Sequence, residues 1–183
     1  MENDYLVAHE NDDRMPITPK SRMRLMLWDH AIMTYITGIP YFFAFYLSEQ
    51  GYFSKDYLAS FMIFLMMGIY INKDLVGARS IAKRVLGYKL IDKHSGLNAS
   101  SLQCFMRNML LPFLWPIEVI VAWYKPEIRI GDRMAGTELI KAEKQKFWSI
   151  IRDVPKTLSD KKLGLTLAFS LAYAFVIYWI DIF

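Results

Sequence analysis

Four long apolar segments alternate with short polar ones along the chain. They run from Leu25 to Leu47, Tyr57 to Ile71, Phe105 to Tyr124 and Leu163 to Ile182. Each holds roughly 15 to 23 residues, close to the ~20 that a helix needs to cross a bilayer. A surface helix of a soluble protein would carry a polar stripe, and these segments carry almost none. The pattern predicts an all-α membrane protein with three or four transmembrane helices rather than a soluble globular domain.

The distribution of Lys and Arg predicts the side of the membrane on which each loop lies, because short loops rich in these residues stay in the cytoplasm. The polar N-terminal tail, residues 1–20, and the residues just after it carry Arg14, Lys20, Arg22 and Arg24. The loop from Glu49 to Asp56 carries a single basic residue, whereas the loop after the second segment carries six. We therefore expect a multi-pass protein with a cytoplasmic N-terminus and its first loop outside.

The third apolar segment has two possible arrangements. Ten basic residues lie between Lys125 and Lys162, and a third crossing would place all of them outside, against the charge rule. Pro112 and Pro116 fall in the middle of the segment, where each removes a helix hydrogen-bond donor and clashes with the preceding turn. A re-entrant hairpin broken at these prolines keeps the basic residues inside, and we favour it. The alternative is a proline-kinked helix that crosses the membrane.

Residues 141–162 are expected to form an amphipathic surface helix or linker before the last apolar segment. An apolar stripe recurs here at helical spacing, and it comprises Phe147, Ile150, Ile151 and Val154. Basic residues lie opposite the stripe, so the helix would lie on the anionic inner surface of the membrane. Alternatively, the stripe packs against other cytoplasmic residues. Residues 163–183 would form an additional C-terminal transmembrane helix.

The polar segments on either side of the third apolar segment contain signals of regular structure. Val85 to Ile91 is a short strand candidate, followed by the turn residues of Asp92 to Gly96. Ser100 and Gln103 have the capping-box spacing that begins a helix. Thr137 to Ile140 is a second extended candidate. If both strands are cytoplasmic they would pair as a small β-hairpin-like element that closes the base of the re-entrant hairpin.

The composition gives little support to an enzyme or a metal protein. Cys104 is the single cysteine and the three histidines are far apart, so no Cys and His set has the spacing of a zinc site. The chain also lacks the hydrolase, metalloprotease and phosphate-loop motifs. Its net charge of +4 is modest, and its basic residues lie in membrane-flanking loops, which argues against nucleic acid binding. We predict neither catalysis nor a bound cofactor or metal.

Three segments, in order, resemble the RDD family of membrane proteins, which is named for one arginine and two aspartates. The first is SRMRLMLWDHAI, in which Arg22 precedes Asp29 by seven residues. The second is GARSIAKRVLGYKLIDKHSG, similar to the family's glycine and basic segment followed by a strand and a turn. The third is GDRMAGTELI, similar to the family's aspartate followed by Gly-Thr and an apolar ending. The resemblance covers about residues 21–140, which would form an RDD-like membrane domain.

The resemblance implies that Arg22, Asp29 and Asp132 are the name-giving residues, with Arg24 as a competitor for Arg22. Two features depart from the family pattern. Ala82 stands where a glycine usually precedes the lysine, and many members lack the segment that begins at Leu163. The resemblance also implies that the protein resides in the bacterial inner membrane.

Ionisable side chains in or near the apolar segments are the candidate functional residues, because a charge inside a membrane requires a partner. Asp29 lies about one turn into the first segment, and we expect Arg107, at the start of the third, to be its best-placed partner. Asp132 would be bridged by Arg22 or Arg24.

Glu118 is a further candidate, because its neighbours in the third segment are apolar on both sides. At the deep end of a re-entrant hairpin it would contribute to a cation site together with free backbone carbonyls. Alternatively, it faces the opposite aqueous side and is solvated there, which we favour.

Two functions are compatible with these residues. In the first, the protein exchanges monovalent cations for protons, with Asp29 and either Glu118 or Asp132 as alternating cation and proton sites. Three or four spans rarely enclose a pathway alone, so this function requires a homo-oligomer. In the second, Arg22, Asp29 and Asp132 form an internal clasp in a non-transporting membrane protein. Its basic cytoplasmic face would then recruit anionic lipid or another membrane protein.

Overall fold

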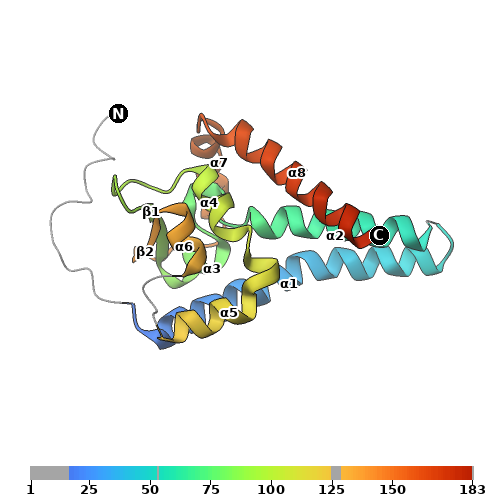
Figure 1. Ribbon diagram of the computed structural model, residues 1–183, viewed down its shortest axis with the longest axis horizontal. Helices are drawn as coiled ribbons and strands as arrows, with labels where there is room; N and C mark the ends of the chain where they lie inside the picture. The colour runs from blue at the N-terminus through green and yellow to red at the C-terminus, as the bar shows by residue number, and fades with distance from the viewer. Residues whose placement is uncertain (1–16, 53, 125–128, 183) are drawn as a thin grey trace.

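Helices make up most of the protein, and a small sheet joins two distant segments. The computed structural model describes residues 17–52, 54–124 and 129–182, and it is 68% helical. The elements, in chain order, are α1 (Pro19–Glu49), α2 (Lys55–Ile71), the 3₁₀ turn η1 (Val76–Ala78), α3 (Ile81–Leu86), β1 (Tyr88–Asp92), α4 (Ser101–Asn108), α5 (Leu111–Tyr124), α6 (Ile130–Ala135), β2 (Thr137–Lys141), α7 (Ser149–Leu158) and α8 (Leu163–Ile182) (Figure 1). The predicted helical fold with a small two-stranded element is confirmed.

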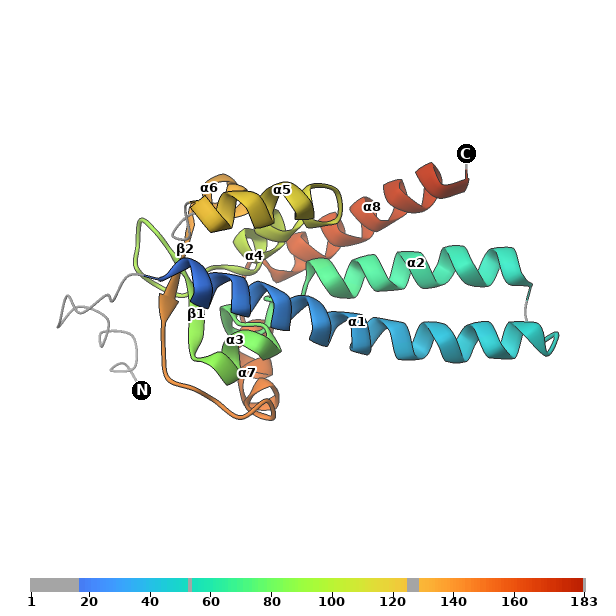
Figure 2. The ribbon, with the colours of Figure 1, turned by 90° about the horizontal axis from the view of Figure 1, so that it is seen from below.

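The first two helices form a long arm that extends away from a compact end containing the sheet and the short helices (Figures 1 and 2). α1 begins at Pro19, and the side chain of the preceding Thr18 caps it by accepting a hydrogen bond from the Ser21 backbone N–H. The 31 residues of the helix extend over about 46 Å. Large apolar side chains stay exposed along it, including Phe42 at 72%. Such a surface suits lipid rather than water.

Within the described part of the chain, α1 is the one helix long and apolar enough by itself to cross a membrane. α2 has 17 residues, and α8 contributes the shorter apolar stretch Leu163–Val176. α8 packs against α2 and α4 and leaves the compact end in the same direction as the arm (Figure 2). Tyr173 on α8 donates a hydrogen bond to the Met109 carbonyl at 2.5 Å.

The third apolar segment does not form one continuous helix. It begins within α4, breaks at Met109 and Leu110, and continues as α5. The chain reverses at the break, since α5 lies against α1 and α6 returns to pack against α4 (Figure 2). The break precedes Pro112, which lies in the first turn of α5. Backbone N–H groups in that turn have no partner within the helix, so the missing N–H of proline costs no hydrogen bond there. Pro116 lies inside α5 and does not end it.

The two predicted strands pair. β1 and β2 are antiparallel, with Leu90 opposite Leu139. The first strand begins at Tyr88 and not at Val85, because residues 81–86 form α3, which ends at Gly87 in a left-handed conformation with φ +77°. A side chain at Gly87 would lie 2.7 Å from the Ala142 carbonyl oxygen, so only glycine allows the helix to end here and the strand to begin.

The predicted capping box is also present: the Ser100 hydroxyl accepts from the Gln103 backbone N–H, and the Gln103 side chain accepts from the Ser100 N–H. The Asp92 to Gly96 segment forms the expected turn, in which the Asp92 carboxylate accepts from the His94 backbone N–H at 2.8 Å.

The surface helix is shorter than the predicted 141–162 segment and presents its apolar face outward. α7 covers only Ser149–Leu158, and it packs against η1 through polar residues, with Thr157 accepting from the Gly77 N–H at 3.2 Å. Ile151 is 65% exposed and Leu158 is 68% exposed. The alternative in which the apolar stripe packs against the protein is therefore wrong for Ile151.

Candidate functional site: a buried ion-pair network

Three buried carboxylates from distant parts of the chain meet where the arm joins the compact end. Asp29 lies on α1, Asp74 follows α2, and Asp132 lies on α6; each is at most 4% exposed. Four buried or nearly buried cations alternate with them, and we call the seven residues the clasp: Lys73, Asp29, Lys83, Asp74, Arg107, Asp132 and Arg22.

Asp29 is held by the N-terminal turn of α3. The Lys83 ammonium lies 3.0 Å from its Oδ2, and the Lys73 ammonium lies 3.3 Å from the same oxygen. The Ser80 hydroxyl donates to Oδ1 and also caps α3 by accepting from the Lys83 N–H. The start of α3 is thereby fixed against the middle of α1.

Asp74 joins the α2 end of the arm to α3 and α4. Its Oδ1 lies 2.5 Å from the Lys83 ammonium, so one lysine bridges two carboxylates. Its Oδ2 accepts from Arg107 Nη1 and from Asn108 Nδ2, both at 3.0 Å. Asn108 also donates to the Ile71 carbonyl at 3.1 Å, which ties α4 to the last residue of α2.

Asp132 closes the clasp between α1 and α4. Arg22 Nη2 donates to its Oδ2 at 2.5 Å, and Arg107 Nε donates to its Oδ1. The Thr137 hydroxyl donates to Oδ1 at 3.3 Å, and the Arg129 backbone N–H donates to Oδ2 at 3.3 Å. Asp132 therefore accepts hydrogen bonds from four residues, of which Arg22 lies 110 positions away in the sequence.

A second ion pair adjoins the clasp at the start of α6. Glu118 on α5 is fully buried; it pairs with the Arg129 guanidinium and accepts from the Gly131 backbone N–H at 3.1 Å. A side chain at Gly131 would lie 2.1 Å from the Arg107 carbonyl oxygen, so the α6 backbone approaches α4 as closely as a glycine permits.

Electrostatics keep the clasp ionised. Burial by itself raises the pKa of Asp132, but the nearby Arg107 and Arg22 guanidiniums outweigh it and lower that pKa below its usual range. The pKa of Asp74 is lowered in the same way, against its burial, by Lys83 and Arg107. A carboxylate with a lowered pKa in the folded state contributes stability above about pH 4, and this contribution is lost only at more acidic pH.

The clasp carries more positive than negative charge, since its four cations face three carboxylates. Two nitrogens of Arg22, Nε and Nη1, are buried without a hydrogen-bond partner among the described residues. Across residues 17–52, 54–124 and 129–182, no group of three Cys, His, Asp or Glu side chains is arranged to hold a metal ion.

Comparison with known proteins gives one result. The RDD family model matches residues 18–182, nearly the whole chain. The chain belongs to the RDD family. The match extends beyond the 21–140 segment that carries the sequence motifs and includes α7 and α8. Neither the curated proteins nor the solved structures compared with the chain include a match.

The structure places the RDD-motif residues in one network. Arg22 pairs with Asp132 as expected, and Arg24 is exposed, so it does not compete for that role. The expected pair of Asp29 and Arg107 is wrong, because Arg107 bridges Asp74 and Asp132 while Asp29 binds two lysines.

Glu118 is not solvated, contrary to the arrangement we favoured from its sequence neighbours. It is buried because the reversal before α5 brings it next to Arg129, eleven positions along the chain. Sequence patterns missed Lys73, Asp74 and Lys83, which lie in the polar stretch after the second apolar segment. Two signals would have indicated them: Lys73 and Asp74 come within three residues of the end of an apolar segment, and Lys83 lies within the family's basic motif.

Proposed function

We propose that this RDD family member is a non-transporting membrane protein, in which the clasp is a structural joint that fixes the membrane helices to a small cytoplasmic end. The main support is that each clasp carboxylate already contacts two resident cations. Its basic cytoplasmic face would then recruit anionic lipid or another membrane protein. Removing one member of such a buried pair leaves an uncompensated charge, which typically costs about 3–5 kcal/mol.

The topology that fits this proposal has three crossings, formed by α1, α2 and α8. α4 and α5 would form the re-entrant hairpin, since the chain returns from α5 to the end where α4 begins. The N-terminus and the sheet would lie in the cytoplasm and the end of α8 outside. This arrangement keeps the basic residues between α5 and α8 inside, as the charge rule requires.

Exchange of monovalent cations for protons is the second candidate, and the geometry supports it less. A metal cation entering the clasp would add to an existing positive excess, and a carboxylate would first have to leave its resident partners. A pathway between copies of the chain would also be needed, so this function retains the requirement for a homo-oligomer.

One experiment separates the two functions. Purified protein is reconstituted into liposomes with an internal pH dye, sodium, potassium or lithium gradients are imposed, and the midpoint of thermal unfolding is measured on the same samples. The variant is Asp29→Asn, and the matched control is Glu143→Gln, which neutralises an exposed carboxylate.

We expect no cation-dependent proton movement above empty liposomes, together with a lower unfolding temperature for Asp29→Asn only. Cation-dependent proton movement that Asp29→Asn abolishes without loss of stability would reject the structural joint and establish exchange.

A further inference from the structure

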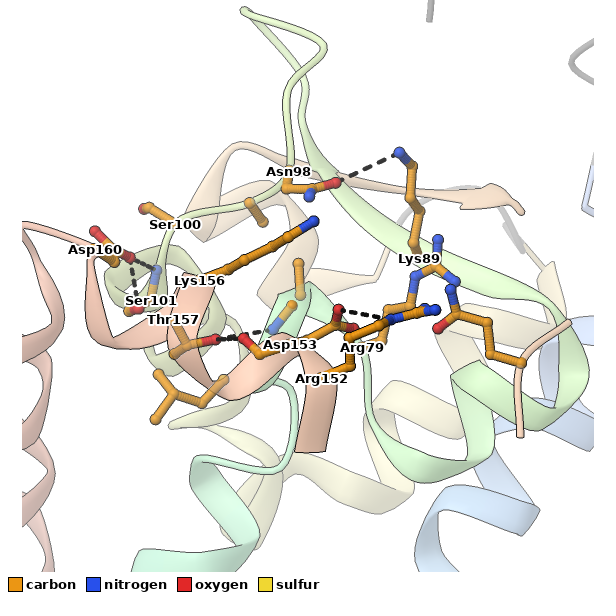
Figure 3. A pocket seen from close by; sticks show the side chains of 15 residues that line it. Arg79, Lys89, Asn98, Ser100, Ser101, Arg152, Asp153, Lys156, Thr157 and Asp160 are labelled. Atoms are coloured by element: carbon orange, nitrogen blue, oxygen red, sulfur yellow. Dashed lines mark hydrogen bonds and ion pairs between the residues drawn. The ribbon is translucent and has the colours of Figure 1, made fainter. Parts of the chain in front are cut away.

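A cavity of about 670 Å³ lies on the compact end, and its lining residues are distinct from those of the clasp. One wall is α7 together with Asp160, two residues beyond its end; the other comprises the η1 turn, β1 and the approach to α4 (Figure 3). A non-helical segment links the end of β2 to α7. The cavity therefore forms only when α7 packs back onto η1.

Four cationic side chains line the cavity, and they come from both walls. Arg79 and Lys89 lie on one side, and Arg152 and Lys156 extend from α7 on the other. Figure 3 shows the Lys156 side chain reaching across the cavity toward the side of Asn98 and Lys89. Four positive charges therefore converge on one space from segments about seventy residues apart.

The two carboxylates that line the cavity are already engaged elsewhere. Asp153 Oδ2 accepts from the buried Arg84 guanidinium at 2.6 Å. Asp160 Oδ2 accepts from the Ser101 backbone N–H at 2.8 Å and from the Ser101 hydroxyl at 2.5 Å. Their shortest contacts therefore hold α7 and the α4 N-terminus in place and are not made to the cationic side chains of the cavity.

The contacts of these cations within the described residues are long. Arg79 Nη1 donates to the Glu143 carbonyl at 3.4 Å, Lys89 Nζ donates to Asn98 Oδ1 at 3.4 Å, and Arg152 Nε lies 3.9 Å from Asp153 Oδ1. Burial, followed by the nearby Arg84, lowers the pKa of Arg79, and burial, followed by Arg79, lowers the pKa of Lys89. Burial and repulsion between cations thus raise the free energy of the protonated Arg79 and Lys89 side chains, and an anion bound in the cavity would lower it.

We infer that this cavity binds a phosphate-bearing anion between Arg79 and Lys89 on one wall and Arg152 and Lys156 on the other. Phosphate offers several charged acceptor oxygens, which suits guanidinium and ammonium donors arriving from opposite sides. The same chemistry occurs in an anionic phospholipid headgroup and in a soluble phosphate compound. Bound in either form, the anion would fasten α7 to the compact end. The inference does not depend on whether the protein transports ions.

The test measures thermal unfolding of the full chain in nanodiscs. One set uses phosphatidylcholine alone and is titrated with pyrophosphate against sodium chloride at equal ionic strength. The other set contains increasing phosphatidylglycerol and no added pyrophosphate. A ligand that binds only the folded state raises the unfolding temperature as its concentration rises.

The pocket variant is Arg79→Gln with Lys156→Gln, one residue from each wall. The matched control is Lys146→Gln with Lys161→Gln, which removes the same charge from exposed positions outside the cavity. Because Arg79 is half-buried, Arg152→Gln with Lys156→Gln serves as a second pocket variant in which both positions are exposed.

We expect one of the two additives to stabilise the wild type and the control, and the pocket variants to need at least about tenfold more of it, since each variant loses two charged donors and a tenfold change in affinity is about 1.4 kcal/mol. Stabilisation by pyrophosphate identifies a soluble phosphate compound, and stabilisation by phosphatidylglycerol alone identifies a lipid headgroup. Absence of stabilisation by both, or an equal loss in the control, would overturn the inference.

Discussion

At the residue scale, Arg107 joins two carboxylates of the clasp through two different nitrogens, whereas Lys83 joins two through its single ammonium. Nε donates to Asp132 and Nη1 donates to Asp74 at 3.0 Å, so one planar group joins the α6 side of the network to the turn after α2. A lysine presents a single ammonium on a flexible stem and cannot reproduce this geometry, even though it retains the charge.

We therefore expect Arg107→Lys to lower the free energy of unfolding by about 2 kcal/mol or more, the contribution of one charge-assisted hydrogen bond. Chemical denaturation in detergent, followed by tryptophan fluorescence, measures this loss. Arg133→Lys is the control, since Arg133 is exposed on α6. Equal stability of the two variants would mean that charge alone, and not the bridging geometry, holds the clasp.

Gly131 sets how closely α6 approaches α4. Its alanine variant would place a methyl group 2.1 Å from a backbone oxygen that cannot rotate away, so we expect Gly131→Ala to destabilise the fold by about 3 kcal/mol. Gly164→Ala is the matched control, because a methyl group there meets nothing within 4 Å. The same denaturation measurement compares them, and a stable Gly131→Ala protein would contradict the close approach.

At the element scale, α7 is attached to the compact end by its polar side. Arg84 is fully buried and donates to Val76 O at 2.6 Å, Asp153 at 2.6 Å and Ser149 at 3.0 Å, so a single residue of α3 positions the helix. Arg84 directly follows Lys83, which belongs to the clasp. Two consecutive residues of α3 therefore bind different partners: Lys83 binds the clasp carboxylates, and Arg84 binds α7. The apolar side of α7 stays exposed, at Ile151 and Leu158 among others.

Substitution of Arg84 is expected to release α7 and leave the rest of the fold in place. In Arg84→Gln, amide hydrogen exchange across residues 149–158 should accelerate at least about tenfold, since several hydrogen bonds to one guanidinium are lost. Lys146→Gln is the control, because Lys146 is an exposed cation just before α7 that does not line the cavity. Unchanged exchange in Arg84→Gln would show that other contacts hold the helix.

At the scale of the whole molecule, three helices leave the compact end in one direction while α4 and α5 turn back (Figure 2). The C-terminus should then lie on the same side of the membrane as the loop after α1. Reporter fusions after Phe183 and within the Gly51 loop are expected to be active as alkaline phosphatase and dark as green fluorescent protein. A fusion to the N-terminus provides the cytoplasmic control, and a fluorescent C-terminal fusion would contradict the three-crossing arrangement.

The sequence alone determined those features that depend on neighbours along the chain. Apolar run length indicated the long helices, the spacing of Ser100 and Gln103 indicated a helix start, and the turn residues of Asp92 to Gly96 indicated where β1 ends. The order of three short motifs was sufficient to indicate the family that the whole-chain match established. Each of these signals acts within a few residues, so it can be read without knowing the fold.

Only the tertiary structure decided which charges are paired. Asp29 binds Lys73 and Lys83 rather than Arg107, and Glu118 is buried against Arg129 rather than solvated. These partners depend on how α3, α4 and α6 close around the end of the arm, which local pattern does not specify. An ion pair requires a few ångströms of separation in space, and the reversal between α4 and α5 sets that separation for residues far apart in sequence.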